Sequence, residues 1–241
     1  ILFGEKCRII KFAKKNSFVF IETSVDKYNG WIDRKYIKPL NKNDVAKNII
    51  CIPSVNVTSK PNVKSSSLMN LPFGAKVIIL KKELEFSEIF LPKNSYSNAK
   101  GYIPNNSYEN INKKYKDWVN FSEKFVGTPY KWGGRTGQGI DCSGLLQISI
   151  QKLLVDVPRD TGIQERYFRL NKNNLIKNHS DYKRGDILFW KGHVAICVDN
   201  KNLIHANAFH HRTEIEKIEG AINRIKKLSG KISSHIRLKN I

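Results

Sequence analysis

The chain has 241 residues, of which 40% are hydrophobic and 26% are charged. This length and composition fit two or three compact globular units and exclude a disordered chain. No run of about 18 apolar residues occurs, so we expect no transmembrane segment. The formal net charge is +21. The lysines occur singly or in pairs and form no dense basic block interleaved with aromatics, so we expect no nucleic acid partner and keep polyanion binding as the alternative.

The first hundred residues contain an internal repeat. Residues 3–10 match 73–80, residues 18–22 answer 87–91, and residues 30–32 answer 101–103. Both copies alternate apolar and polar residues between turn signals, which predicts two small units of short antiparallel strands. A further strand at 54–58 leads the second copy. The first copy lacks its equivalent, so we expect the chain to begin inside a domain.

The order of strand, Phe-Gly turn, strands and a closing Gly-aromatic-Ile resembles bacterial SH3-like domains. This resemblance implies two small all-β barrels, 1–42 (truncated at its N-terminus) and 43–110, followed by a third domain at 111–241. Polar stretches at 39–44 and 105–112 are predicted linkers. After the second, apolar residues recur at helical spacing up to Gly127, which predicts a helix.

A Gly-rich loop, 133–139, leads into Asp141, Cys142 and a run of apolar residues at helical spacing. Asp141 is a natural N-cap, because its carboxylate can accept the open backbone N–H groups of a first turn. Cys142 then lies at the positive end of a helix, where a thiolate is favoured over a thiol. We therefore predict that Cys142 is a nucleophile; the alternative is a small buried core residue.

The remainder of the chain predicts an α+β order. Thr161 could cap a short helix at 162–170, and strands are expected at 187–190, 193–198 and 203–208. A further helix, with one apolar face, is expected between residues 215 and 228. A strand expected at 232–238 closes the domain. That face comprises Ile215, Ile218, Ile222, Ile225 and Leu228.

A cysteine nucleophile needs a base, and the base needs a partner that fixes its tautomer. His193 and His205 lie in successive predicted strands and are the candidates. An odd number of connecting residues would put both rings on one face of the sheet, whereas a two-residue turn would put them on opposite faces. The other histidines, at 179, 210, 211 and 235, have weaker sequence contexts, and one of the pair could instead be a hydrogen-bonded core residue.

The motifs of this half of the chain resemble those of the NlpC-type cell-wall cysteine peptidases, in the same order and over about 117–238. They are YxWGG (130–134), DCSG (141–144), PRD (158–160), RGD (184–186), GHVAI (192–196) and LIHA (203–206). The resemblance implies a papain-like domain with a central antiparallel sheet. It also implies Cys142 as nucleophile, His193 as base and His205 as the polar third member of the site.

Together with the SH3-like pair, residues 205–208 and 221–225 are similar to those of recycling-type γ-D-glutamyl-L-diamino-acid endopeptidases. That likeness implies hydrolysis of peptidoglycan-derived peptides with a free N-terminal L-Ala, in the cytoplasm, without cofactor or metal. It places five residues against the substrate: Tyr130, Trp132, Asp141, Ser143 and Thr161. An acidic residue of the first SH3-like unit commonly holds the substrate amine in such enzymes, and Glu22 is the candidate for that role here. Arg159 could meet a substrate carboxylate or brace the loop.

Three alternatives stay open. A wall-binding or scaffolding protein with a vestigial catalytic domain would explain the tandem SH3-like half. The same core could transfer the acyl group to an acceptor other than water. A periplasmic or wall-associated location is the alternative to the cytoplasm. The sequence does not choose between diaminopimelate and lysine at the cleaved bond, between intact wall and released peptides, or between oligomeric states.

Overall fold

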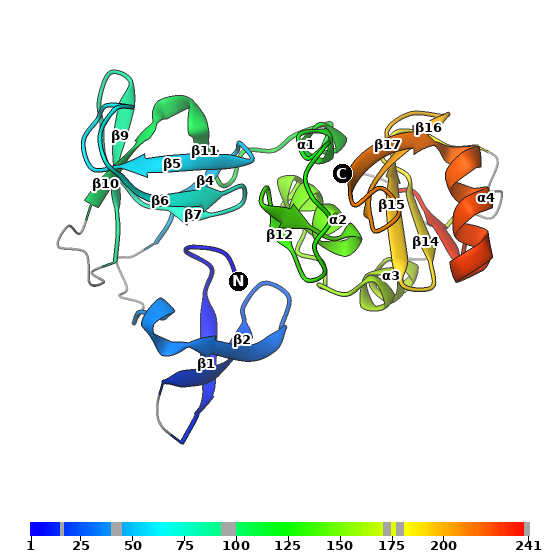
Figure 1. Cartoon of the computed structure of the whole chain (residues 1–241), viewed down its shortest axis with the longest axis horizontal. Helices are drawn as coiled ribbons and strands as arrows, with labels where there is room; N and C mark the ends of the chain where they lie inside the picture. The colour runs from blue at the N-terminus through cyan, green and yellow to red at the C-terminus, as the bar shows by residue number, and fades with distance from the viewer. Residues whose placement is uncertain (15–16, 40–44, 93–99, 171–174, 177–180, 239–241) are drawn as a thin grey trace. The chain divides into compact units, whose positions relative to one another are not determined.

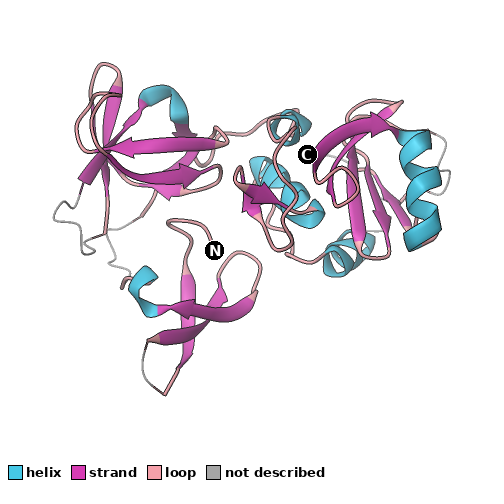
Figure 2. Ribbon diagram, viewed as in Figure 1, coloured by secondary structure: helices cyan, strands magenta, loops and turns pink. Residues whose placement is uncertain are grey.

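The computed structural model describes residues 1–14, 17–39, 45–92, 100–170, 175–176 and 181–238. The chain forms two compact units, Ile1–Lys113 and Lys114–Ile241 (Figure 1). It is rich in antiparallel sheet, with few and short helices (Figure 2). Among the described helices, none has the length and apolar character needed to cross a membrane.

The first unit contains two main sets of strands. One is the three-stranded sheet of β1 (Cys7–Phe12), β2 (Phe18–Thr23) and β3 (Asn29–Asp33). The other is a five-stranded sheet in the order β6-β5-β10-β9-β8. Its strands are β5 (Ser54–Thr58), β6 (Ser67–Pro72), β8 (Ile79–Lys82), β9 (Phe86–Phe90) and β10 (Lys100–Pro104). The strand expected at 54–58 is confirmed as β5.

The predicted repeat is visible in the irregularities of the two sets. The β1–β2 pairing shifts register between Ile9 and Lys11, and the β8–β9 pairing shifts between Ile79 and Lys81, at the matching position. Short 3-10 helices, η1 (Arg34–Tyr36) and η2 (Asn105–Ser107), follow β3 and β10. The matching bulges and turns indicate that the two copies adopt the same local backbone conformation.

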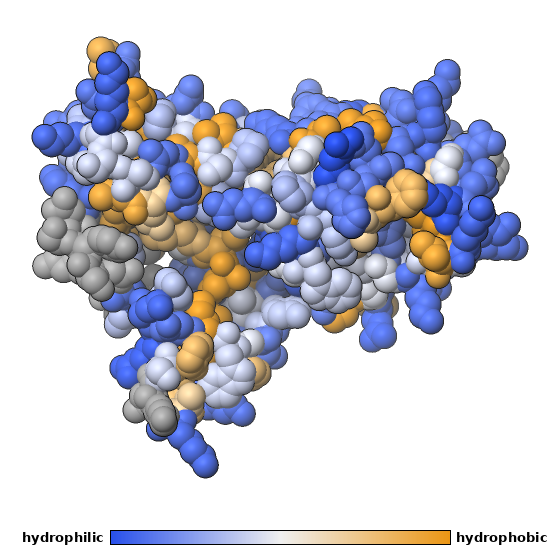
Figure 3. All heavy atoms as spheres, in the orientation of Figure 1, coloured by the Kyte–Doolittle hydropathy of each residue, from blue (hydrophilic) through white to orange (hydrophobic). Residues whose placement is uncertain are grey.

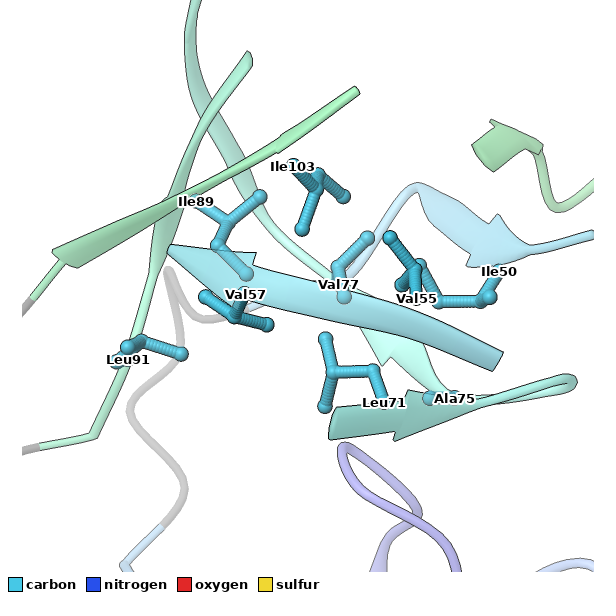
Figure 4. Packing of buried hydrophobic residues seen from close by; sticks show 9 residues of the cluster. All are labelled: Ile50, Val55, Val57, Leu71, Ala75, Val77, Ile89, Leu91 and Ile103. Atoms are coloured by element: carbon cyan, nitrogen blue, oxygen red, sulfur yellow. The ribbon is translucent and has the colours of Figure 1, made fainter. Parts of the chain in front are cut away.

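Nine apolar side chains form the core of the second set, in Figure 4. They are Ile50, Val55, Val57, Leu71, Ala75, Val77, Ile89, Leu91 and Ile103. Each is at least nine-tenths buried. Two alternate residues of β5, Val55 and Val57, point into this cluster, as the period of two in a strand requires.

The stretch 105–112 is not a linker, which corrects the sequence expectation. After η2 it forms β11 (Tyr108–Asn110), which pairs with β4 (Asn48–Ile50) in the sheet β11-β4-β7, where β7 is Lys76–Val77. Its polar composition is that of an edge strand, whose outer face meets solvent. The other predicted linker lies outside the described residues over 40–44.

The second unit is built on a five-stranded antiparallel sheet in the order β17-β16-β15-β14-β18. The strands are β14 (Ile187–Trp190), β15 (His193–Cys197), β16 (Asn202–Asn207), β17 (Arg212–Lys217) and β18 (Ser234–Ile236). The helices are α1 (Val119–Glu123), α2 (Cys142–Ile150), α3 (Thr161–Leu170) and α4 (Ile218–Ser229), with the 3-10 turn η3 (Gln151–Leu153) after α2. The strands expected at 187–190, 193–198 and 203–208 are confirmed within one residue, and β18 is a shorter form of the closing strand.

The C-terminal helix begins later in the chain than the sequence predicts. Residues 212–217 form strand β17, and α4 begins at Ile218. Ile215 therefore belongs to the sheet, and Leu228 is 87% exposed although the apolar face was expected to bury it. Ile218, Ala221 and Ile225 do pack against the sheet core. A second addition is a small hairpin in the Gly-rich loop, β12 (Arg135–Thr136) with β13 (Gly139–Ile140).

Hydrophilic residues are spread over the visible face of the protein, and apolar ones lie in small groups between them (Figure 3). This distribution is that of a solvated surface.

Candidate active site

Helix α2 begins at the nucleophile candidate, as the sequence predicts. Asp141 has extended backbone angles and is the N-cap, with Oδ1 accepting the Gly144 N–H at 2.7 Å. Cys142 is the first helical residue. The whole helix is buried, because it packs against strands β15 and β16. The fold therefore fixes where the sulfur lies.

The Cys142 thiol is 8% exposed and has polar neighbours from two other elements. Sγ lies 3.8 Å from Oγ1 of Thr161, the first residue of α3. The Val194 backbone N–H also donates to the sulfur. That N–H belongs to the peptide unit joining His193 to Val194, so the sulfur lies at the start of β15.

Burial raises the pKa of the Cys142 thiol, and the Asp141 carboxylate acts in the same direction. The hydrogen bonds from Thr161, Val194 and Ser143 lower it. The helix start was expected to favour a thiolate, but burial of the thiol outweighs these donors. The resting nucleophile is thus a thiol, and a base must remove its proton during the reaction.

The two candidate histidines lie on one face of the sheet. Strands β15 and β16 pair Cys197 with Leu203, which leaves five connecting residues, 198–202, and so selects the odd-loop alternative. His193 Nε2 and His205 Nδ1 are 2.8 Å apart, and the rings meet edge to face. His205 is fully buried, whereas His193 at the strand start keeps partial access to solvent.

Both imidazoles are held neutral. Burial lowers the pKa of His193 to about 3, with a further lowering from His205. Burial also lowers the pKa of His205, although its hydrogen bond to Glu216 opposes that change. A neutral imidazole next to a thiol is the form that can accept a proton from it.

Asp141 and Arg159 form a buried ion pair behind the helix start. Arg159 Nη1 donates to Asp141 Oδ1 at 2.9 Å and Nη2 donates to Oδ2 at 2.6 Å. Nη1 also donates to Ser143 Oγ and Nη2 to the Gly134 carbonyl. Asp141 Oδ2 further accepts the Gly133 N–H at 2.8 Å. Of the two alternatives for Arg159, the structure shows the supporting role: its hydrogen bonds connect the Gly-rich loop to the start of α2.

The remaining residues predicted against the substrate are differently placed. The Tyr130 phenol is half-buried, and burial raises its pKa, with smaller contributions in the same direction from Cys142 and Asp141. Trp132 is 87% exposed. Ser143 is buried, and its hydroxyl donates to Asp141 while accepting from Arg159. Glu22 lies on β2 of the other compact unit, where Arg8 donates to it at 3.3 Å.

Sequence reasoning missed Glu216. Its Oε1 lies 2.6 Å from His205 Nε2, and Arg224 of α4 donates to the same oxygen. His210 Nε2 is 3.4 Å from that oxygen too. The sequence signal for this strand was the alternation of polar and less polar residues over 212–217. Our interpretation of the stretch as part of a helix concealed it.

His205, His210 and Glu216 are also a group whose ligand atoms lie within 4.8 Å of one another, close enough to hold a metal ion. A cation there would lie beside the Arg224 guanidinium, which already neutralises the carboxylate. This charge balance favours a hydrogen-bonded ion pair over a metal centre. His235 is separate: it is fully buried and bonds Asp186 at 2.7 Å, and His179 lies outside the described residues.

The candidate site lies within a stretch of the chain that is similar to a known protein family. Residues 127–229, which include Cys142, His193, His205 and Glu216, match the NlpC/P60 family. The chain is 25% identical over 203 residues to the gamma-D-glutamyl-L-lysine dipeptidyl-peptidase of Bacillus cereus, covering 78% of this chain and 59% of that protein. It is 23% identical over 247 residues to dipeptidyl-peptidase 6 of Lysinibacillus sphaericus, covering 91% and 83%. The chain thus spans less than two thirds of the first relative.

The fold is similar to that of a solved NlpC/P60 family protein from Bacillus cereus. The TM-score is 0.78 at 21% sequence identity, over 98% of this chain and 80% of the other. At this identity the likeness concerns the fold.

Proposed function

We propose that this chain, whose residues 127–229 form an NlpC/P60 family domain, is a cysteine endopeptidase acting on peptidoglycan-derived peptides. Its substrate bond is the γ-D-glutamyl–diamino-acid bond of peptides with a free N-terminal L-Ala. The observation that carries the proposal is the buried Cys142 thiol, which accepts a hydrogen bond from the backbone N–H of Val194, the residue that follows a neutral His193 bonded to His205. The name of the Bacillus cereus relative, gamma-D-glutamyl-L-lysine dipeptidyl-peptidase, supports the substrate class.

The site supports acyl-enzyme chemistry. In the proposed reaction His193 takes the Cys142 proton as the sulfur attacks the γ-carbonyl carbon of D-Glu. The Cys142 backbone N–H at the helix start is positioned to stabilise the oxyanion. Collapse of the tetrahedral intermediate breaks the C–N bond, and His193 returns its proton to the leaving amine. A water molecule then releases the acyl group, with His193 acting again as base.

The substrate side of the proposal includes Tyr130, Trp132, Asp141, Ser143, Thr161 and Glu22. Thr161 has direct support, because its hydroxyl oxygen lies 3.8 Å from Cys142 Sγ. Asp141 already accepts five hydrogen bonds, so a substrate ammonium would have to displace one of these donors. Glu22 is included on the sequence resemblance alone.

The proposal also covers architecture and location. We infer a papain-like catalytic domain at 111–241, preceded by SH3-like domains at 1–42 and 43–110; the matching register shifts of β1–β2 and β8–β9 support the repeat. We propose a cytoplasmic location, supported by the odd number of cysteines that remain once Cys142 acts as nucleophile.

The test uses the full chain with L-Ala-γ-D-Glu-diaminopimelate, its lysine counterpart and the N-acetylated form of each, with products identified by mass spectrometry. We expect release of the diamino acid from the free-amine peptides and loss of this release in Cys142→Ala. Cys7→Ser, at a half-buried cysteine of the first unit, is the matched control and should retain activity. Unchanged turnover by Cys142→Ala would refute the nucleophile, and equal cleavage of acetylated peptides would refute the amine requirement.

A further inference from the structure

Three hydrogen-bonded side chains continue from the candidate base away from the nucleophile. His193 Nε2 lies 2.8 Å from His205 Nδ1, and His205 Nε2 lies 2.6 Å from Glu216 Oε1. Because His193 Nε2 is occupied by His205, Nδ1 is the ring nitrogen left to serve the thiol. Resting on the proposed function, we propose that Glu216 is a positioning residue that acts through His205 to fix the tautomer of His193, keeping Nδ1 open for the Cys142 proton.

The first step of the argument is the charge of Glu216. Burial opposes its ionisation, but the hydrogen bond from His205 and the charge of Arg224, with His210 nearby, bring its pKa below the ordinary value. Glu216 is therefore a carboxylate at neutral pH. A carboxylate has no proton to donate, so it can only accept a hydrogen bond.

The second step follows the protons along the chain. His205 is neutral and must carry its single proton on Nε2, where it donates to Glu216. Its Nδ1 then has a lone pair and can only accept. The bond at 2.8 Å consequently requires a proton on His193 Nε2. Neutral His193 is left with an unprotonated Nδ1, which is the form that removes a proton from a thiol.

The third step is what happens without the carboxylate. His205 could then hold its proton on Nδ1 and donate to His193 Nε2. His193 would carry its own proton on Nδ1, which cannot accept another from Cys142. In a Ser-His-Asp triad the loss of the orienting carboxylate acts in this way, through the wrong tautomer.

The surroundings of Glu216 are built to hold it in place. It projects from β17, where its backbone pairs with Leu203 of β16. Arg224 reaches its carboxylate from α4, and the same guanidinium lies 4.3 Å from the Phe209 ring centroid. Two elements thus fix one carboxylate, and its side chain is 18% exposed. When His193 gains the thiol proton, this carboxylate also offsets the new positive charge through His205.

The experiment compares Glu216→Gln and Glu216→Asp with Glu214→Gln. Glu214 is two residues away on the same strand and pairs with Arg212 instead of a histidine, so it is a matched control. We expect Glu216→Gln to lower kcat by roughly 10- to 100-fold, as loss of an orienting partner of histidine typically does, while KM changes little. Glu216→Asp should recover part of the loss, and Glu214→Gln should behave as wild type.

A second readout needs no peptide substrate. The rate of Cys142 alkylation by iodoacetamide, followed against pH, reports transfer of the thiol proton to His193. Glu216→Gln should slow this reaction at pH 7 to a similar degree. If the wild-type protein cleaves no γ-D-glutamyl peptide but Glu216→Gln still slows the alkylation of Cys142, the proposed function fails and the role of Glu216 stands.

The inference is overturned if Glu216→Gln matches wild type in both kcat and alkylation. Should Glu216 variants fail to fold, ¹⁵N NMR of the histidines in the wild-type protein decides the matter. Resonances showing His193 protonated on Nε2 and unprotonated on Nδ1 support the proposal, and the opposite tautomer refutes it.

Discussion

The guanidinium of Arg159 and the carboxylate of Asp141 meet edge to edge, with nitrogen–oxygen distances of 2.9 and 2.6 Å. Both side chains are about nine-tenths buried. The same carboxylate caps the helix that begins with Cys142 and accepts the Gly133 N–H. The ion pair therefore connects the Gly-rich loop, α2 and the segment before α3.

Removing one partner of this pair should be costly. We expect Arg159→Gln to lower the free energy of unfolding by about 3–5 kcal/mol, because it leaves a buried carboxylate without its counter-charge. Arg8→Gln is the control: its pair with Glu22 is exposed, and its loss should cost less than about 1 kcal/mol. Urea denaturation measures both. Equal losses in the two variants would show that the buried pair does not stabilise the loop.

Gly144 is a second point of close contact behind the nucleophile. A Cβ there would lie 2.4 Å from the Gly134 carbonyl oxygen and 2.9 Å from Asp141 Oδ1. We expect Gly144→Ala to reduce stability by about 1–3 kcal/mol, the usual cost of overpacking. Gly220→Ala is the control, since nothing lies within 4 Å and the residue is inside α4. It should raise stability by roughly 0.5–1 kcal/mol. Thermal unfolding of both variants checks the opposite signs.

Local signals in the sequence predicted much of this architecture. The cap at Asp141, the helix start at Cys142 and the strands bearing His193 and His205 each depend on a few neighbouring residues. The shared face of the histidines was not predictable, because it depends on register. The five-residue connection that decides it is a property of the folded hairpin.

The stretch around Ile215 shows why the remainder could not be predicted. Isoleucines at 215, 218, 222 and 225 fit one face of a helix, but residues 212–217 are needed as the outer strand beside β16. Tertiary pairing overrode local periodicity, and Glu216 was hidden with it. The thiolate expected at Cys142 also depended on context, because burial of the helix start opposes the effect of its position.

Thr161 gives a prediction about the nucleophile. Its hydroxyl lies 3.8 Å from Cys142 Sγ and lowers the pKa of the thiol. Thr161→Val keeps the shape and removes the donor, so alkylation of Cys142 by iodoacetamide at pH 7 should slow by about 2- to 10-fold, the effect of one hydrogen bond. Thr161→Ser retains the hydroxyl and should stay near the wild-type rate. If Val and Ser substitutions act alike, the methyl group and not the hydroxyl is responsible.

Stability should fall on mild acidification because His193 is buried as a neutral ring. Its folded-state pKa is about 3 against an ordinary value of 6.5. Between these values the unfolded chain binds a proton and the folded chain does not. The contribution of neutral His193 to the free energy of unfolding is therefore complete above pH 6.5. It is lost as the pH falls towards 3, by at most about 1.4 kcal/mol per pH unit. Urea denaturation from pH 7 to 4.5 measures this slope.

His193→Gln should flatten that slope, because the substituted side chain does not titrate. His205 is also buried as a neutral ring, so the stability of His205→Gln should depend less steeply on pH than that of the wild type. His211→Asn is the control, since His211 is exposed and its positive φ of 54° is one that Asn adopts readily. It should retain the wild-type slope. A slope unchanged in His193→Gln would mean that His193 binds protons equally in the folded and unfolded chains over this pH range, and would refute its burial as a neutral ring.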